Sequence, residues 1–159
     1  MPGGSGSVGC MAVARSAADG HSILLASNSH IILAPLVISG SPVNVKRDFD
    51  PIALMFTFPF LLVVNPGLGV KTLKEFVDYA KSKPGQLSVG VTPGLGGTAH
   101  LTLERLKLGV GLDVVVVPYK GSAPAIQALL SGEVTALIDT LAGMSALVDS
   151  GKVRALATL

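Results

Sequence analysis

The sequence is poor in the residues that most often reveal a protein's chemistry, which are cysteine, aromatic residues and charged residues. Cys10 is the one cysteine among 159 residues, so an intrachain disulfide and a cluster of thiolate metal ligands are both excluded. Tryptophan is absent and aromatic residues make up 4% of the chain, so we expect no platform on which nucleic-acid bases stack. The formal net charge is +2, with lysines and arginines scattered along the chain, which does not give the basic footprint of a nucleic-acid-binding surface.

Long apolar runs are also missing, although the mean hydropathy is +0.62. The longest run, residues 52–64, contains Thr57 and Pro59 and is shorter than the roughly 20 residues that span a bilayer as a helix. It fits buried strands better. The hydrophobic content of 49% is enough for a substantial core, and the length suits one domain of ordinary size or two small lobes.

The chain is organised around residues 87–101, LSVGVTPGLGGTAHL. This stretch predicts a short buried strand at 87–91, a glycine-rich turn at 92–97 and then a helix capped by Thr98. Glycines let the backbone approach a ligand closely, and the unpaired N–H groups at a helix N-terminus favour an anion. The order outlines a cradle for an anion; a plain connection between a strand and a helix is the alternative.

Strand and helix patterns alternate along the rest of the chain. Strands or extended segments are predicted at residues 22–27, 51–64, 87–91, 113–117, 134–138 and 153–157, and helices at 8–17, 31–37, 72–82, 98–108, 122–131 and 141–149. Residues 38–50 are predicted to form a loop. Thr72 and Glu75 form a capping box, and the consecutive valines at 114–117 indicate a strand buried on both faces. Short connections between these elements predict an α/β fold, with a mainly parallel sheet covered by helices on both faces.

An early glycine motif, GSGSVG at residues 4–9, formally matches the dinucleotide-binding fingerprint G-x-G-x-x-G. That fingerprint requires a strand immediately before its first glycine. Only Met1-Pro2-Gly3 precede it, so we interpret the motif as a glycine loop that leads into a helix. No signal peptide is recognisable, and the abrupt opening suggests a start partway through a fold.

Polar residues follow two of the predicted strands. Asn28, Ser29 and His30 come directly after residues 22–27, and Asp139 follows the strand at 134–138. The carboxyl ends of parallel strands are where open α/β sheets bind ligands. Asp139 could therefore hold an amine or hydroxyl of a ligand, but each of these residues could equally serve to cap the helix that follows it.

No catalytic or metal-binding pattern accompanies these cradles. Ser122 lies outside the G-x-S-x-G elbow, and the histidines lack metal-ligand spacing. We therefore expect a binding protein with no metal and no cofactor. Two alternatives remain open. One is an α/β enzyme that uses the glycine-rich loop for an anionic substrate, with His100 as acid and base; the other is an interaction domain whose exposed apolar surface meets a partner.

Six runs in order carry a family resemblance: residues 2–9, 19–25, 48–52, 92–101, 117–125 and 151–157. They are PGGSGSVG, DGHSILL, DFDPI, TPGLGGTAHL, VPYKGSAPA and GKVRALA. Together they resemble the substrate-binding receptors of tripartite tricarboxylate transporters, the Bug or TctC-like periplasmic binding proteins. The resemblance covers residues 2–159 and is strongest at residues 117–125.

This resemblance implies a two-lobed Venus-flytrap receptor of the type II periplasmic-binding-protein fold, which captures a small carboxylate and delivers it to membrane transporter subunits. The implied ligand-binding residues are Asn28, Ser29, Thr92, Gly94, Gly96, Gly97, Thr98 and Asp139. Asp139 would contact the far end of the ligand and determine which ligand is bound. Gly97 stands where many members of the family have a side-chain hydroxyl. The full-length family member is periplasmic.

Members of the family are about twice as long, so the resemblance also implies a partial chain, truncated at both ends. Residues 1–57 would be a remnant of lobe one and residues 58–159 would form lobe two. We then expect weak carboxylate binding, because half of a cleft leaves a bound anion partly solvated. Apolar faces near residues 23–26 and 52–64 would favour self-association.

Overall fold

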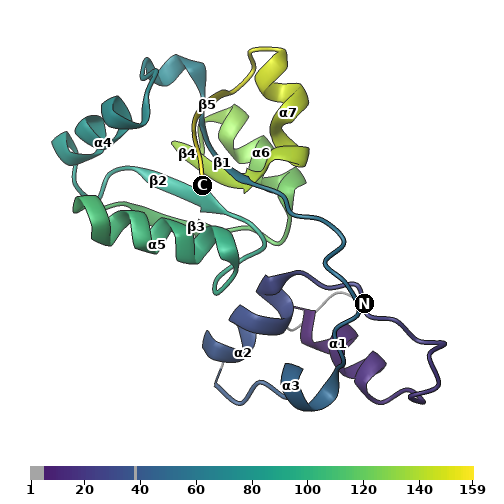
Figure 1. Cartoon of the computed structure of the whole chain (residues 1–159). Helices are drawn as coiled ribbons and strands as arrows, with labels where there is room; N and C mark the ends of the chain where they lie inside the picture. The colour runs from purple at the N-terminus through teal and green to yellow at the C-terminus, as the bar shows by residue number, and fades with distance from the viewer. Residues whose placement is uncertain (1–5, 38) are drawn as a thin grey trace. The chain divides into compact units, whose positions relative to one another are not determined.

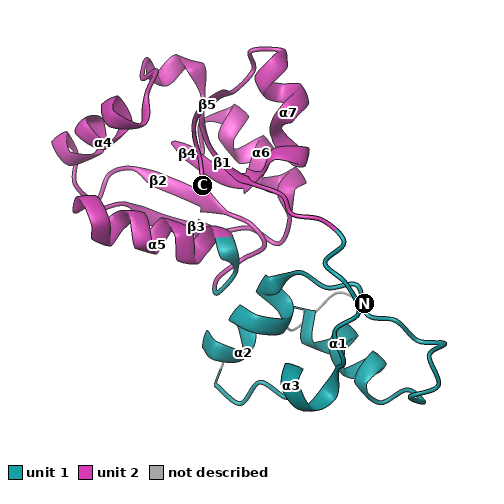
Figure 2. Ribbon diagram, viewed as in Figure 1, with its two compact units in different colours: residues 1–55, 96–98 teal, residues 56–95, 99–159 magenta. Residues whose placement is uncertain are grey.

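A computed structural model of the chain describes residues 6–37 and 39–159. The chain forms two compact units, which are coloured separately in Figure 2. Unit 1 contains Met1–Met55 and Gly96–Thr98, and unit 2 contains Phe56–Leu95 and Ala99–Leu159. The predicted lobe boundary between residues 57 and 58 concerns the lobes of a complete receptor and stays a prediction.

Unit 2 is built from five strands with helices between them (Figure 1). In chain order its elements are β1 (Phe60–Val64), the 3-10 helix η3 (Pro66–Leu68), α4 (Leu73–Ser82), β2 (Ser88–Val91), α5 (Thr98–Val110), β3 (Val115–Pro118), α6 (Ser122–Ser131), β4 (Ala136–Thr140), α7 (Leu141–Asp149) and β5 (Arg154–Thr158). The first residue of α5 groups with unit 1. The predicted alternation of strands and helices is confirmed here, with element ends within a few residues of those expected.

The sheet has the strand order β3-β2-β4-β1-β5. β2 runs parallel to both β3 and β4, but β1 is antiparallel to both β4 and β5. The prediction of a mainly parallel sheet is therefore wrong in detail, since the sheet is mixed. β1 inserts between β4 and β5 and runs against both, and nothing in a local apolar run specifies that direction.

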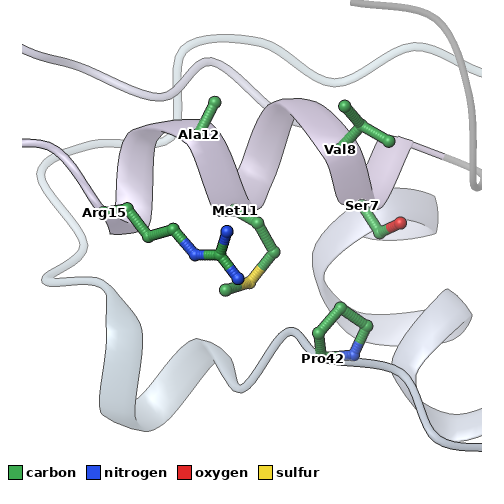
Figure 3. A pocket seen from close by; sticks show the side chains of 6 residues that line it. All are labelled: Ser7, Val8, Met11, Ala12, Arg15 and Pro42. Atoms are coloured by element: carbon green, nitrogen blue, oxygen red, sulfur yellow. The ribbon is translucent and has the colours of Figure 1, made fainter.

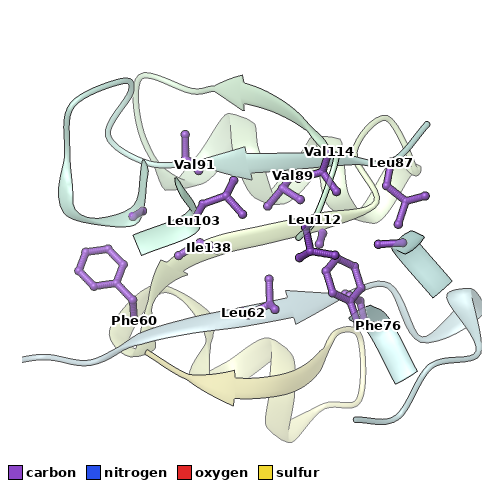
Figure 4. Packing of buried hydrophobic residues seen from close by; sticks show 14 of the residues in the cluster. Phe60, Leu62, Phe76, Leu87, Val89, Val91, Leu103, Leu112, Val114 and Ile138 are labelled. Carbon is purple, nitrogen blue, oxygen red and sulfur yellow. The ribbon is translucent and has the colours of Figure 1, made fainter. Parts of the chain in front are cut away.

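Helices cover both faces of this sheet, as predicted. One apolar cluster packs α4 and α5 on the sheet, with Phe76 and Leu103 essentially buried beside Leu62 of β1 (Figure 4). The other cluster packs α6 and α7 on the opposite face, around Leu129 and Met144. Alternate residues of β1 and β4 face the two clusters, which is the two-residue period of strands buried on both sides.

The β3 strand differs from its prediction. It is an edge strand, and Val115 is 52% exposed. The run of valines predicted burial on both faces, but an edge position leaves one side of the strand without a neighbour. Pro118, which has no N–H to donate, is compatible with that edge position.

Local signals fix the start of α4. Thr72 is its N-cap, and the Thr72 hydroxyl accepts a hydrogen bond from the Glu75 N–H at 3.2 Å. The Glu75 carboxylate in turn accepts from the Lys71 N–H at 2.7 Å. The predicted capping interaction is thus present, with the glutamate reaching one residue further back than in the standard box.

Unit 1 holds the remaining helices: α1 (Ser7–Ala14), the π-helix η2 (Ser29–Leu33), α2 (Ala34–Val37) and α3 (Val45–Asp48). The predicted helices at 8–17 and 31–37 are confirmed in outline, whereas the predicted loop at 38–50 contains α3, which Asn44 caps. The first two residues of the GSGSVG motif, and the residues before it, lie outside the described residues. Gly6, in the same motif, has a positive φ of 86° and precedes α1.

The predicted strand at residues 22–27 is wrong, since these residues are not part of any strand in the described structure. Their sequence has strand character, and Ile23 and Leu25 are 71% and 68% exposed. A strand needs a partner for its backbone groups, and among the described residues none pairs with this segment.

Residues 51–59 lead into β1 without any strand assignment of their own. Ile52, Leu54 and Phe56 recur at every second position and are all more than half exposed. The predicted extended run at 51–64 is thus a strand only in its last five residues. An unpaired apolar strand extension of this kind favours association with other chains.

Candidate functional site

The glycine-rich loop has the predicted position between a strand and a helix. β2 ends at Val91, residues 92–97 turn, and α5 begins at Thr98. Gly94 and Gly96 have positive φ angles of 73° and 78°, a region that residues with a side chain enter only with strain. The Thr92–Pro93 peptide bond is cis. The local backbone therefore has the glycine-dependent turn before a helix N-terminus that an anion cradle requires.

Three of the predicted site residues form hydrogen bonds within unit 1. The Ser29 hydroxyl accepts from the Thr98 N–H at 3.2 Å and lies 2.8 Å from the Thr98 hydroxyl. The Thr98 hydroxyl also donates to Asn28 Oδ1 at 3.2 Å. The first N–H of α5 therefore donates to the Ser29 hydroxyl. The Thr98 hydroxyl itself is hydrogen-bonded to Asn28 and Ser29.

The register of the parallel strands brings two other predicted residues to one edge of unit 2. Val91 of β2 pairs with Ile138 of β4, so the next residues along lie side by side: Thr92 directly follows β2, and Asp139 is the penultimate residue of β4. Both are buried, at 3% and 1% exposure. Neighbouring strands lie about 4.8 Å apart. The start of the glycine-rich loop and the predicted selectivity residue are thus adjacent.

Asp139 is held by only one of its two carboxylate oxygens. Oδ1 accepts a hydrogen bond from the Thr140 N–H at 2.6 Å. Oδ2 is buried and has no hydrogen-bond partner among the described residues. The alternative prediction was that Asp139 caps the helix that follows it. Thr140 is the N-cap of that helix instead, and its hydroxyl accepts a hydrogen bond from the Gly143 N–H at 3.4 Å. A buried acceptor without a partner is costly, and such an oxygen invites a functional explanation.

Sequence reasoning missed two neighbours of Asp139, which are Ser122 and Gly143. A β-carbon placed on Gly143 would lie 3.6 Å from Ser122 Oγ and 3.8 Å from Asp139 Oδ2. Ser122 is the first residue of α6, whose N-cap is Gly121, and no side chain caps that helix in the described structure. The signal that could have found them is a glycine four residues after the aspartate, at the start of a helix.

Tyr119 lies at the same sheet edge, directly after β3. Its ring covers Gly90, where a β-carbon would come within 3.3 Å of the ring and 3.1 Å of Leu137. Burial raises the pKa of the Tyr119 hydroxyl, and the hydrogen bond to Glu133 at 3.1 Å adds to the rise. Tyr119 is thus a packing residue with a fixed hydroxyl.

His100 does not assemble a catalytic set. Its Nε2 lies 3.9 Å from Glu104 Oε1, the same oxygen that accepts from Lys107 Nζ at 2.9 Å. A nucleophile–base pair needs heavy atoms within about 3.2 Å, and no such pair with His100 occurs among these contacts. The groups of histidine, cysteine and carboxylate side chains in the described residues also include none that could hold a metal ion.

Unit 1 carries a surface hollow of about 370 Å³ beside α1. In Figure 3, Met11 and Arg15 extend from α1 toward the segment that carries Pro42. None of the predicted ligand-binding residues lines this hollow. No helix in the part of the chain that the structure describes has the length and apolar character needed to cross a membrane.

Proteins of known family are similar to this chain along its whole length. The family model described as "Tripartite tricarboxylate transporter family receptor" matches residues 1–159. Protein BugT of Bordetella pertussis is 37% identical over 158 residues, which are 99% of this chain and 48% of BugT. The chain thus spans about half the length of the curated relatives it matches.

Solved structures of similar proteins superpose on nearly the whole of this chain. "R. palustris Rpa4515 with adipate" superposes with a TM-score of 0.90 at 33% identity, over 98% of this chain and 52% of that one. "MatC (Rpa3494) from Rhodopseudomonas palustris with bound malate" gives 0.84 at 28% identity, over 99% and 53%. "Structure of periplasmic binding protein BugD" gives 0.85 at 30% identity, over 98% and 52%. The α/β fold of periplasmic binding proteins predicted from the sequence is confirmed by these similarities, and the match of the family model over residues 1–159 shows that the chain belongs to the receptors of the tripartite tricarboxylate transporter family.

Proposed function

We propose that this chain provides the carboxylate-binding part of an extracytoplasmic solute receptor. The observation that carries the proposal is the β2–β4 register, which sets the glycine-rich loop beside Asp139 at the carboxyl ends of two parallel strands. This is the edge at which open α/β sheets bind ligands. Two similar proteins have been solved with adipate and with bound malate, and both compounds are small dicarboxylates.

The proposed chemistry is hydrogen bonding without catalysis. Backbone N–H groups of the turn at residues 92–97 would hold one carboxylate, since Gly94, with nothing within 4 Å of its β-carbon position, lets the backbone approach an anion closely. Asp139 would contact the far end of the ligand. Asn28 and Ser29 remain predicted ligand contacts, as do Gly97 and Thr98. No cofactor is needed for such binding.

The proposed partners follow from the family. Its receptors serve tripartite tricarboxylate transporters, so a membrane transporter would receive the carboxylate from the receptor. The receptor would work in the periplasm, since the similar protein BugD is a periplasmic binding protein. We also propose that the chain by itself associates with copies of itself through its exposed apolar residues.

A titration followed by NMR tests the proposal. Succinate is added to the ¹⁵N-labelled chain, and succinamide, in which neutral amides replace both carboxylates, serves as the control. The amides of residues 92–97 should shift with succinate and not with succinamide, with a dissociation constant near the millimolar range, or about 4 kcal/mol. Equal shifts with both compounds, or shifts confined to other segments, would contradict carboxylate recognition by this loop.

A further inference from the structure

The last residues of the glycine-rich loop pack within unit 1, to which Gly96–Thr98 belong. A β-carbon built on Gly96 would come within 2.6 Å of Val37 Cγ2, so the backbone there lies directly against the Val37 side chain. Around the β-carbon position of Gly94, in contrast, no atom of the described residues beyond its chain neighbours lies within 4 Å. The turn therefore has an open half at Gly94 and a covered half at residues 96–98.

Ser29 pairs with the covered half at the start of α5. Its hydroxyl accepts a hydrogen bond from the Thr98 N–H, with 3.2 Å between nitrogen and oxygen. This N–H is the first of the helix, and it is one of the four that have no carbonyl partner inside a helix. Ser29 is 8% exposed, so the bond is sheltered from solvent. A donor that an anion would use at this helix N-terminus is thus already paired inside the chain.

The protons of the two hydroxyls are paired as well. A hydroxyl has one proton to donate and two lone pairs that accept. Thr98 donates its proton to Asn28 Oδ1 at 3.2 Å, so the 2.8 Å contact between the Ser29 and Thr98 hydroxyls uses the proton of Ser29. Neither hydroxyl has a proton left for a carboxylate, which can only accept hydrogen bonds. We call these three hydrogen bonds among Asn28, Ser29 and Thr98 the Ser29 latch.

We propose that the Ser29 latch is an autoinhibitory contact on the glycine-rich loop. The Ser29 hydroxyl takes the place of a ligand oxygen at the first N–H of α5, and a carboxylate uses that N–H only after displacing it. This inference rests on the proposed function, because it requires that the loop binds a carboxylate. The family resemblance makes Ser29 a ligand contact, whereas the latch makes it a competitor of the ligand. The two roles predict opposite effects of removing the hydroxyl.

The latch weakens carboxylate binding without blocking it. A hydrogen bond from an N–H to a charged oxygen is about twice as strong as one between neutral groups, and the helix N-terminus favours negative charge. A carboxylate therefore displaces the Ser29 hydroxyl from the N–H. Ser29 keeps its 2.8 Å bond to the Thr98 hydroxyl when it leaves. The cost to the ligand is one neutral hydrogen bond, which corresponds to about fivefold in the dissociation constant.

Removal of the Ser29 hydroxyl tests the latch. Succinate is titrated into the full ¹⁵N-labelled chain, and the shifts of the amides of residues 92–98 give the dissociation constants. Ser29→Ala should bind succinate about fivefold tighter than the wild type, because the Thr98 N–H is released. Ser27→Ala is the matched control, since the Ser27 hydroxyl pairs with His30 Nδ1 at 3.1 Å. This control should bind succinate as the wild type does.

Two further measurements support the comparison. Amide hydrogen exchange without added succinate should show the Thr98 N–H protected in the wild type and exposed in Ser29→Ala, because its acceptor is gone. Ser29→Cys is a second variant that keeps the shape of the side chain, but a thiol is a weak acceptor. It should also bind succinate more tightly than the wild type.

The outcomes separate this inference from the proposed function. Equal or weaker succinate binding by Ser29→Ala and Ser29→Cys would show that Ser29 does not compete with the ligand, while carboxylate binding by the wild type would stand. Rapid exchange of the Thr98 N–H in the wild type would show that the latch does not form in solution, and the inference would be wrong. If no chain binds succinate, the proposed function is wrong and the inference is overturned with it.

Discussion

The Asp139→Asn substitution should make the chain more stable. Asp139 is 1% exposed, its Oδ1 accepts from Thr140 at 2.6 Å, and its Oδ2 has no partner among the described residues. An unsatisfied buried acceptor costs about 1–3 kcal/mol, and more when it is charged. Asparagine keeps the acceptor for Thr140 and removes the negative charge from the buried group. We therefore expect a gain of about 1–2 kcal/mol.

Urea unfolding followed by circular dichroism measures this gain, with the slope of the transition unchanged. In a unit of about 100 residues, each kcal/mol corresponds to about 4–8 °C in melting temperature. Asp113→Asn is the control, because Asp113 is exposed and its change should stay within about 0.5 kcal/mol. If Asp139→Asn is instead less stable than wild type by more than that margin, Oδ2 is well satisfied in the folded chain and the reasoning is refuted.

Three other substitutions test the packing of the core, the N-cap of α4 and the self-association of the chain. Leu62→Ala, at a fully buried position in β1, which lies between β4 and β5, should cost about 2–5 kcal/mol in urea unfolding; a loss below about 1 kcal/mol would mean that the core is not packed as described. Thr72→Ala removes the N-cap of α4 and should cost about 1 kcal/mol, whereas Thr72→Ser should restore most of it; no difference between the two would contradict the capping role. Leu54→Lys, at an 83% exposed position, should lower the average mass in light scattering at high protein concentration, and an unchanged mass would show that the segment around residue 54 does not mediate association.

Local signals explain which parts of the fold were predictable from sequence. The helix at 141–149 was predicted with its observed ends, because Thr140 caps it and Gly151 follows it. The strand, glycine-rich turn and helix at 87–110 are also encoded by neighbouring residues. In contrast, the direction of β1 depends on its pairing with β4 and β5, which lie more than 70 residues away. A local pattern does not specify such a pairing.

The segment at residues 22–27 shows the same limit in the opposite case, because a strand was predicted there and none forms. Its short apolar run at residues 23–26 predicts a strand, yet strand formation needs a neighbour that supplies backbone hydrogen bonds, and none among the described residues does so. The valines at 114–117 predicted a central strand for similar reasons, but β3 lies at the sheet edge. Apolar character predicts that a segment can be buried, and the tertiary pairing decides whether it is.

The candidate site was partly accessible to sequence reasoning. Asp139 was identifiable as an acid at the end of an apolar strand, and the glycine-rich loop by its composition. Ser122 and Gly143 were not identifiable, because they approach Asp139 only when α6 and α7 pack on the same face of the sheet. The role of each residue in ligand binding remains a prediction from these positions.

The central claim is that the glycine-rich loop holds a carboxylate beside Asp139, and a crystal structure of the chain grown with malate tests it most directly. We predict a carboxylate of malate with its oxygens within about 2.7–3.2 Å of backbone nitrogens in residues 92–97, and the far end of malate on the side of Asp139. Malate bound at another surface, or loop amides that are all paired with protein carbonyl groups while Asp139 faces away from the ligand, would contradict the account.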